Sequence, residues 1–438
     1  MWPNNGWIDK DFWRSDVLLW MSVGFLHVSP ALSSICLGLF ILQLLFFGDT
    51  VSIPGVQRWG FGAVSLALLW NMACLWDSIS MGWITQTFLT DRAAADMQKL
   101  ALVKIQVKLP LCIVLGLYAA GRRLPSLLYR AWPVLVLPLI WIAVSSVIHY
   151  AQHRAFYDQM VLESKPIPLY SNVYHIEFAV MVGVVVLLML YGLLNHRIES
   201  KESRRWLMAA LLVLVVCMHI LGARTGLVTL YLGGGLMAVQ YARNRPKWLL
   251  RGSVIGLVLS LGLLMLPSVQ NRMNNTWVDL KSTFSGGDVT HQSFGQRWVA
   301  WNTACALLGK GEMVYGGYGV GTDEVMKTAY DQGGVELAER HRIGVHNQWL
   351  EGALQSGWIS MALILCAGFL ALMNVKSGQP VNGSAVWLAL VVAMMFESLM
   401  ERQAGILVLM MVFQAPMREK NGMNSEIKKE YALNDENK

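Results

Sequence analysis

The sequence predicts an all-α polytopic membrane protein with about twelve transmembrane helices and one large extramembrane loop. Of its 438 residues, 55% are hydrophobic and only 14% are charged, whereas a typical soluble protein has about 25% charged residues. Apolar runs recur along the chain at close to the length that crosses a ~30 Å hydrocarbon core. Short basic connections separate several of these runs, as in proteins whose basic loops set their membrane orientation.

Taken in order, the apolar runs define the expected spans. The first two form either two spans or one long tilted helix, because only His27, Ser29 and Pro30 interrupt them. We expect spans near 17–28, 31–47, 60–77, 102–120, 131–149, 173–194, 206–221, 225–242, 252–267, 347–372, 384–396 and 403–416.

Three basic connections, at 122–130, 197–205 and 243–251, fix the expected orientation. Two predicted spans separate each connection from the next, so all three lie on one side, which the positive-inside rule assigns to the cytoplasm. The long polar stretch then lies on the outer, periplasmic side. The resulting division has N-terminal spans in 1–267, the periplasmic loop in 268–345, C-terminal spans in 346–416 and a disordered cytoplasmic tail in 417–438.

Several classes of function are disfavoured. The formal net charge is +7, but the basic residues lie in connections between apolar runs, so we expect no nucleic-acid partner. The six cysteines have no metal-type spacing, so neither a zinc site nor a disulfide framework is expected. The glycine-rich GGYGVGTDE in the outer loop lacks the spacing of a phosphate-binding P-loop, and its composition predicts a tight turn.

Charged residues within or beside the spans are candidate functional residues, because charge is costly inside a bilayer. Arg224 follows an apolar run at an outer turn, where it either points into the bundle or reaches the headgroups. Lys104 and Lys108 lie four residues apart on one helix face and repel each other unless an anion lies near them. A phosphate-bearing ligand is one such anion, and two lysines reaching the membrane surface are the alternative.

The outer loop and the residue after it supply two further candidates. Arg297 is expected to open an amphipathic helix, where it is either a solvated loop arginine or, with the free N–H groups of the helix start, part of an anion site. His346 stands at the start of another helix and has the side chain best suited to general base catalysis near neutral pH. Asn347 is the better helix cap of the pair, so capping does not explain the histidine.

An acidic and basic cluster, FESLMERQ, lies between the last two apolar runs. Glu397 and Glu401 are one helical turn apart and are expected to share a partner, with Arg402 or Arg224 as the nearest choices. A catalytic carboxylate is the second interpretation, because buried charges usually pair first.

These stretches together resemble the superfamily of O-antigen ligases and O-antigen polymerases. RTG at 224–226 resembles its R-[ST]-G element, and QRWVAWNTACALL followed by YGGYGVGTDE resembles its R-x-x-x-W helix and the glycine turn after it. HNQWLEGALQSGW is similar to its H-N-x-x-L signature with a later glycine, and FESLMERQAGI to an E-x-x-x-E-R-Q-x-G stretch of some members. The resemblance covers roughly 206–416.

The resemblance implies a GT-C-like membrane glycosyltransferase of the bacterial inner membrane, with its active site facing the periplasm. Such an enzyme moves a glycan from undecaprenyl diphosphate to an acceptor, without a metal or other cofactor. Arg224 and Arg297 would bind the pyrophosphate, and His346 would activate the acceptor hydroxyl or assist its positioning. Lys108 and Lys104, from their own charges, are further candidates for the pyrophosphate. Asn347, Glu397, Glu401 and Arg402 would support the site.

The acceptor is left open by the sequence. An O-antigen ligase, which transfers to lipid A–core sugars, is favoured over a polymerase, which extends lipid-linked repeats, and over a protein O-oligosaccharyltransferase. A transporter with charges along a substrate path is the alternative outside this class. It is disfavoured because the halves of the chain show no internal repeat and the single long outer loop suits an enzyme.

Overall fold

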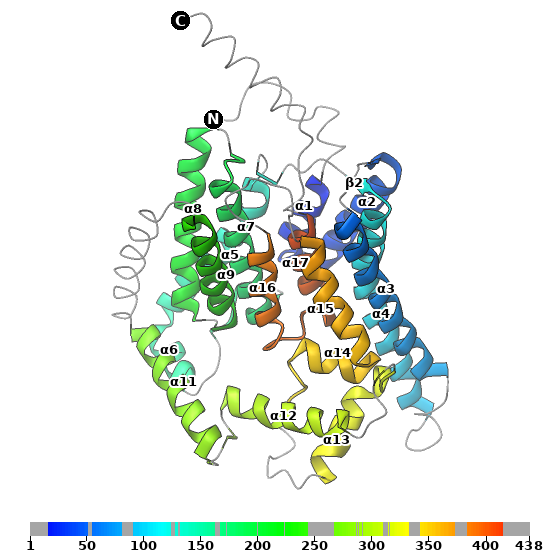
Figure 1. The fold of residues 1–438 in the computed structure, drawn as a ribbon. Coiled ribbons are helices and arrows are strands. Elements are labelled where there is room, and N and C mark those ends of the chain that lie inside the picture. The colour runs from blue at the N-terminus through cyan, green and yellow to red at the C-terminus, as the bar shows by residue number, and fades with distance from the viewer. Residues whose placement is uncertain are drawn as a thin grey trace, which may run out of the picture.

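The computed structural model shows an all-helical bundle apart from two strands of two residues each (Figure 1). It describes residues 16–50, 55–80, 91–123, 128–129, 132–162, 167–171, 173–198, 200–222, 224–243, 267–285, 287, 289–290, 292–309, 314, 316–332, 342–372 and 383–414. The predicted tail at 417–438, and all but the last residue of the predicted span at 252–267, lie outside these residues.

The helices of the N-terminal part follow the predicted apolar runs closely. Ser29 caps the second helix and Pro30 is its first residue, so the first two runs form two helices rather than one. The helix α6 was not predicted. The helices are α1 (Val17–Leu26), α2 (Pro30–Phe47), α3 (Gly55–Ser80), α4 (Asp91–Ala119), α5 (Trp132–Gln152), α6 (Arg154–Leu162), α7 (His175–Leu194), α8 (Lys201–Leu221) and α9 (Arg224–Ala242).

The C-terminal part begins with the helices of the predicted periplasmic loop and returns to apolar helices. The elements are α11 (Pro267–Ser285), α12 (Ser293–Leu308), the 3-10 turn η1 (Gly319–Gly321), α13 (Thr322–Gln332), α14 (Gln348–Ser356), α15 (Trp358–Leu372), α16 (Ser384–Ala393), the 3-10 turn η3 (Leu399–Glu401) and α17 (Gln403–Gln414).

Six described helices are long and apolar enough to cross a membrane, and four more apolar helices are shorter. The polytopic membrane class is therefore confirmed, while the total of about twelve spans stays a prediction. The six are α2, α3, α4, α5, α7 and α8, and the shorter ones are α1, α15, α16 and α17.

The predicted span at 347–372 is wrong as a single helix. Gly357, with φ of 88°, ends α14 after nine residues, and α15 starts at the next residue. A φ in this region suits glycine because it has no Cβ. Nine helical residues extend about 13 Å, well short of the thickness of a bilayer. The helix α14 is therefore a separate short helix that begins two residues after His346.

The helix α7 is the centre of the bundle, since almost all of its residues are buried. The helix α9 packs closely along it because Gly226 has no side chain, and a Cβ there would lie 2.5 Å from the carbonyl oxygen of Ala179. Small residues permit such close approach between membrane helices. The glycine of the RTG stretch thus holds the start of α9, and with it Arg224, against the start of α7.

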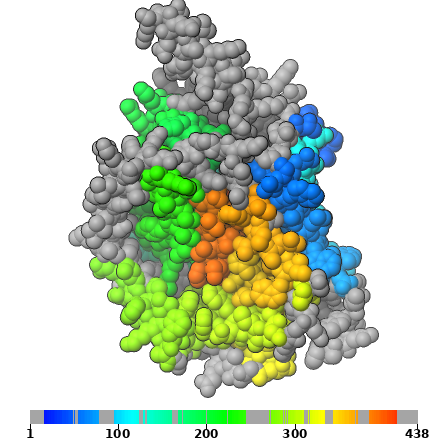
Figure 2. Space-filling view, in the orientation of Figure 1, coloured from blue at the N-terminus to red at the C-terminus, as the bar shows by residue number. Residues whose placement is uncertain are grey.

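The extramembrane elements lie at opposite ends of the bundle (Figure 1). Asp49 and Thr50 of strand β1 pair antiparallel with Arg123 and Arg122 of strand β2 at one end. The helices α12 and α13 lie at the other end. Figure 2 shows the side chains of α11 and α12 lying across the ends of α9 and α16 on this face. The outer-loop helices thus cover the end of the bundle at which α7 and α9 begin.

Candidate outer-face active site

His346 lies in the stretch that leads into α14, and its backbone is strained. Its φ of 44° is in the left-handed region, which non-glycine residues seldom occupy and which is often found at functional sites. Two contacts hold the backbone on either side. The indole N–H of Trp301 in α12 donates to the carbonyl oxygen of Val345 at 3.0 Å, and the Oδ1 of Asn347 accepts from the N–H groups of Trp349 and Leu350. The prediction that Asn347 is the cap is confirmed.

Glu397 is the partner of the His346 side chain. The Nδ1 of His346 lies 3.3 Å from the Oε1 of Glu397, and the two side chains are 27% and 3% exposed. With the proton on Nδ1, this contact leaves Nε2 as the acceptor. The pair therefore orients the imidazole and leaves a basic nitrogen available to a substrate.

The expectation that Glu397 and Glu401 share a partner is wrong. Helix α16 ends at Ala393, and no α-helix runs from there to Gln403, so the spacing of a helical turn does not apply between the two glutamates. Glu397 contacts His346. The carboxylate of Glu401 instead pairs with the Nζ of Lys108 at 2.7 Å and with the Nζ of Lys104 at 3.5 Å. None of the ion pairs described for the two glutamates involves an arginine.

Arg297 lies within α12 and does not open it, because the helix begins four residues earlier at Ser293. Its Nη1 donates to the Ser293 Oγ at 2.7 Å, and its buried Nε has no partner among the described residues. Burial lowers the pKa of Arg297 from its ordinary value, while Glu397 and Tyr174 raise it. A buried guanidinium with an unused donor favours the approach of an anion.

Asp279 of α11 is a member of the site that the sequence did not suggest. Its two carboxylate oxygens accept from the backbone N–H groups of Phe294 and Gly295 at 2.9 and 3.0 Å. Two of the N–H groups at the start of α12 are thus bound by Asp279 and are not free for an anion, which disfavours the alternative in which they add to an anion site. Asp279 also lies 3.7 Å from the Nη1 of Arg224, a long ion pair to a side chain that is 31% exposed.

Arg402 completes the outer group from the start of α17. Its Nη1 lies 3.1 Å from the Oε1 of Glu177, a residue in the first turn of α7. The guanidinium group of Arg402 also lies over the ring of Tyr174. Neither Glu177 nor Tyr174 was predicted. A carboxylate in the first turn of an apolar span was a usable signal, since intramembrane charges mark functional sites. We call His346, Glu397, Arg297, Arg224, Arg402, Asp279, Glu177 and Tyr174 the outer cluster.

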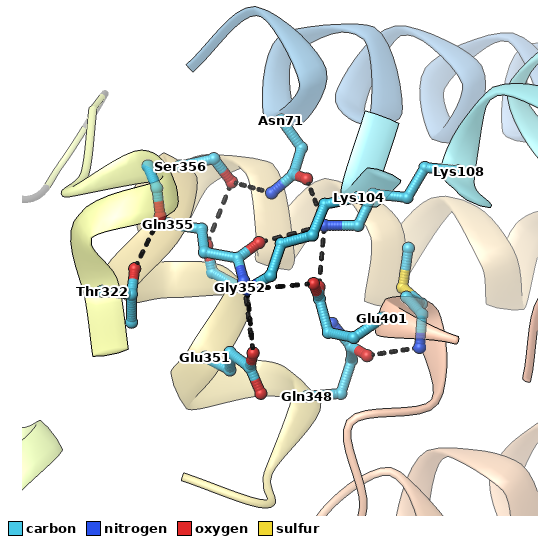
Figure 3. Close-up of polar contacts among 12 residues, drawn as sticks. Asn71, Lys104, Lys108, Thr322, Gln348, Glu351, Gly352, Gln355, Ser356 and Glu401 are labelled. Atoms are coloured by element: carbon cyan, nitrogen blue, oxygen red, sulfur yellow. Dashed lines mark hydrogen bonds and ion pairs between the residues drawn. The ribbon is translucent and has the colours of Figure 1, made fainter. Parts of the chain in front are cut away.

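The lysine cluster is a second polar group, between α3, α4, α14 and η3 (Figure 3). Lys108 is 1% exposed, and its Nζ contacts the Oδ1 of Asn71 at 2.7 Å, the Oε1 of Gln355 at 3.0 Å and the Oε1 of Glu401 at 2.7 Å. Lys104 lies between Glu401 and Glu351 at 3.5 and 3.8 Å. The anion expected beside the two lysines is a protein carboxylate. Whether either lysine binds pyrophosphate stays a prediction.

Comparison with known families bears on the class of the protein. Residues 209–365 match the family model described as O-Antigen ligase. This part of the chain is similar to O-antigen ligases. No curated protein matches the chain significantly. The match indicates a membrane transferase of the O-antigen ligase or polymerase type, which acts with a lipid-linked glycan donor and a glycan acceptor.

The matched segment contains the core of the outer cluster. Arg224, Arg297 and His346 all fall within 209–365, while Glu397 and Arg402 come from the segment after it. Within the described part of the chain, no three His, Cys, Asp or Glu side chains gather as metal ligands would. The charged groups at hand are therefore arginines, carboxylates and one histidine.

Proposed function

We propose that the protein is an inverting glycosyltransferase that moves a glycan from undecaprenyl diphosphate to an acceptor hydroxyl at the periplasmic face of the bacterial inner membrane. The favoured reaction is O-antigen transfer to lipid A–core, and a GT-C-like arrangement of the spans is part of the proposal. A lipid diphosphate is an activated donor, so no further cofactor is needed. The reaction then requires stabilisation of the leaving diphosphate and removal of one proton from the acceptor.

Arg297 and Arg224 are the groups we assign to the diphosphate. Arg297 has a buried Nε without a described partner, and the long Arg224–Asp279 contact leaves Arg224 only weakly engaged. Their charges repel each other, so an anion between them would be favoured. In a low-dielectric site, preorganised guanidinium groups stabilise the negative charge that grows as the bond to the anomeric carbon breaks. We propose that they do so without a metal ion.

His346 is assigned to the acceptor. The acceptor oxygen forms a bond to the anomeric carbon while the bond from that carbon to the diphosphate oxygen breaks, and the electron pair leaves with undecaprenyl diphosphate. The proton of the hydroxyl passes to the Nε2 of His346, and Glu397 stabilises the imidazolium that results. A single displacement inverts the configuration at the anomeric carbon.

The observation that carries this proposal is the pairing of a strained His346 with a buried Glu397 beside an arginine that has an unused donor. A general base, its orienting carboxylate and a diphosphate-binding cation are the parts that the reaction needs. They meet beside α12, which carries Arg297 and whose Trp301 contacts the backbone next to His346.

The test is an assay with purified protein, undecaprenyl-diphosphate-linked glycan and separate acceptors. Release of undecaprenyl diphosphate only with core lipopolysaccharide supports the ligase. Release without another acceptor, with growing glycan chains, supports the polymerase, and release with a Ser- or Thr-containing protein supports protein glycosylation. No release with any acceptor would contradict the transferase and favour a transporter.

A further inference from the structure

The contact between His346 and Glu397 joins two segments 51 residues apart, and regular structure does not hold the second one. Glu397 lies in the loop Met394–Ser398, between the end of α16 and the turn η3. A carboxylate on such a loop positions an imidazole only if the loop itself is fixed. The question is which group fixes it relative to His346.

Gln348, two residues after His346, contacts both ends of this loop. Its backbone N–H donates to the carbonyl oxygen of Met394 at 2.8 Å, and its side-chain Oε1 accepts from the backbone N–H of Met400 at 2.6 Å. Gln348 is the first residue of α14, so its N–H has no partner within the helix and is available for this contact. The residue is 1% exposed.

We propose that Gln348 is a positioning residue that holds the Glu397 loop against His346. It binds the backbone of the first residue of the loop, Met394, and the backbone of Met400, two residues after the loop, so Glu397 lies between two fixed points. The same residue begins the helix that follows His346, so one residue sets the position of Glu397 relative to His346. This inference rests on the proposed function, because it assigns Gln348 a role in the reaction of His346.

Two other contacts fix the turn η3, which follows the loop Met394–Ser398, but they do not contact the loop itself. Glu401 is tied to Lys108 at 2.7 Å, and a Cβ on Gly405 would lie 1.8 Å from the carbonyl oxygen of Leu399. The first acts at Glu401 and the second at Leu399, so both fix η3 rather than the loop Met394–Ser398. The ring of Phe396 also packs against Trp301 of α12, with the ring centroids 5.9 Å apart. Gln348 differs in that its hydrogen bonds hold the backbone on both sides of Glu397, at Met394 and at Met400.

The first test needs no substrate. Hydrogen–deuterium exchange of the whole protein in detergent compares wild type with Gln348→Leu, which keeps the size of the side chain and removes the acceptor for the Met400 N–H. Peptides covering 394–402 are expected to exchange at least tenfold faster in the variant, and peptides from α7 and α17 to be unchanged. Unchanged exchange at 394–402 would overturn the inference whether or not the protein is a transferase.

The second test separates positioning from a general loss of structure. Gln348→Leu and Glu397→Gln are each expected to lower kcat about 10- to 100-fold, with KM changed less than threefold. If Gln348 acts through Glu397, the double variant is no slower than Glu397→Gln alone, within about twofold. Multiplication of the two losses in the double variant would contradict a positioning role.

Two control variants test whether the effect of Gln348→Leu comes from the lost hydrogen bond or from misfolding. Gln348→Glu keeps an oxygen for the Met400 N–H, and the helix start offsets part of the cost of burying its charge, so kcat should fall less than in Gln348→Leu. Gln43→Leu, the same change at a buried glutamine of α2, should leave kcat unchanged. Loss of activity in Gln348→Glu as large as in Gln348→Leu would overturn the inference. Absence of transfer by wild type would instead contradict the proposed function.

Discussion

The outer cluster and the lysine cluster are built from the same kinds of charged side chain, yet their contacts differ. Lys108 has three protein oxygens within 3.0 Å, as many acceptors as an ammonium group has protons. Arg297 keeps a buried Nε without a described partner, and Arg224 meets its carboxylate only at 3.7 Å. Lys108 is fully engaged by the protein, whereas Arg297 keeps a donor without a described partner.

The difference indicates where a substrate can act. A ligand at the lysine cluster would have to displace short contacts that join α3, α4, α14 and η3, and breaking a buried pair leaves an uncompensated charge. A diphosphate at the outer cluster would add contacts to groups that lack them. Burial of charge by itself therefore does not mark a site in this protein, whereas unused hydrogen-bond capacity does.

The largest expected effect comes from removing the base of the outer cluster. His346→Ala should lower kcat about 10²- to 10⁴-fold, because a positioned general base contributes an effect of that size. The measurement is release of undecaprenyl diphosphate under saturating donor and acceptor. His196→Ala is the matched control, since His196 is the other non-glycine residue that the structure describes with a positive φ. Wild-type rates in His346→Ala would exclude the general-base role.

Arg297→Lys should have the next largest effect, lowering kcat/KM for the donor about 10- to 100-fold. Lysine keeps the charge but lacks the planar set of donors that a diphosphate engages. The same change at Arg154, which is 64% exposed on α6, should have no effect on kcat/KM. Equal losses in the two variants would contradict a specific role of Arg297 in binding the donor.

The lysine cluster should respond in stability rather than in donor binding. Lys108→Met leaves Glu401 buried without its closest partner and is expected to cost about 3–5 kcal/mol of stability, measured by thermal unfolding in detergent. Lys108→Met with Glu401→Gln removes both charges and should recover most of the loss. Lys327→Met, at an exposed pair with Glu324, should change stability by less than about 1 kcal/mol. A stable but inactive Lys108→Met would contradict this division of roles.

The smallest expected effect is that of a chelator. Transfer by the purified protein should be unchanged, within about twofold, after dialysis against EDTA, because the proposed reaction relies on arginines for charge stabilisation. The control is a metal-dependent glycosyltransferase treated in parallel. Loss of transfer that added Mg²⁺ or Mn²⁺ restores would contradict the proposed chemistry.

Local features of the molecule could be predicted from the sequence. Apolar runs located most of the described apolar helices to within about five residues, because a span needs an apolar stretch close to the bilayer thickness. The helix α4 begins at Asp91, eleven residues before its predicted run, because a helix can extend beyond its apolar stretch. The cap at Asn347 and the place of Arg224 at the start of α9 also follow from neighbouring residues. The break at Gly357 was missed because a glycine within an apolar run is common in membrane helices and its φ depends on packing.

Pairings between distant segments could not be predicted. His346 meets Glu397 across 51 residues, and Lys108 meets Glu401 across 293, through contacts that exist only once the bundle has formed. The i,i+4 rule misled at Glu397 and Glu401 because the chain leaves the helix between them. Asp279 gave no signal because its role, capping a helix 15 residues later, depends on how α11 and α12 pack.

The central claim is that the donor diphosphate binds the outer cluster and not the lysine cluster. The most direct measurement is the Kd of undecaprenyl-diphosphate-linked glycan for two folded variants, Arg297→Lys and Lys108→Met with Glu401→Gln. The account predicts at least tenfold weaker binding in the first and a Kd within about twofold of wild type in the second. Wild-type affinity in the first variant together with lost affinity in the second would contradict it.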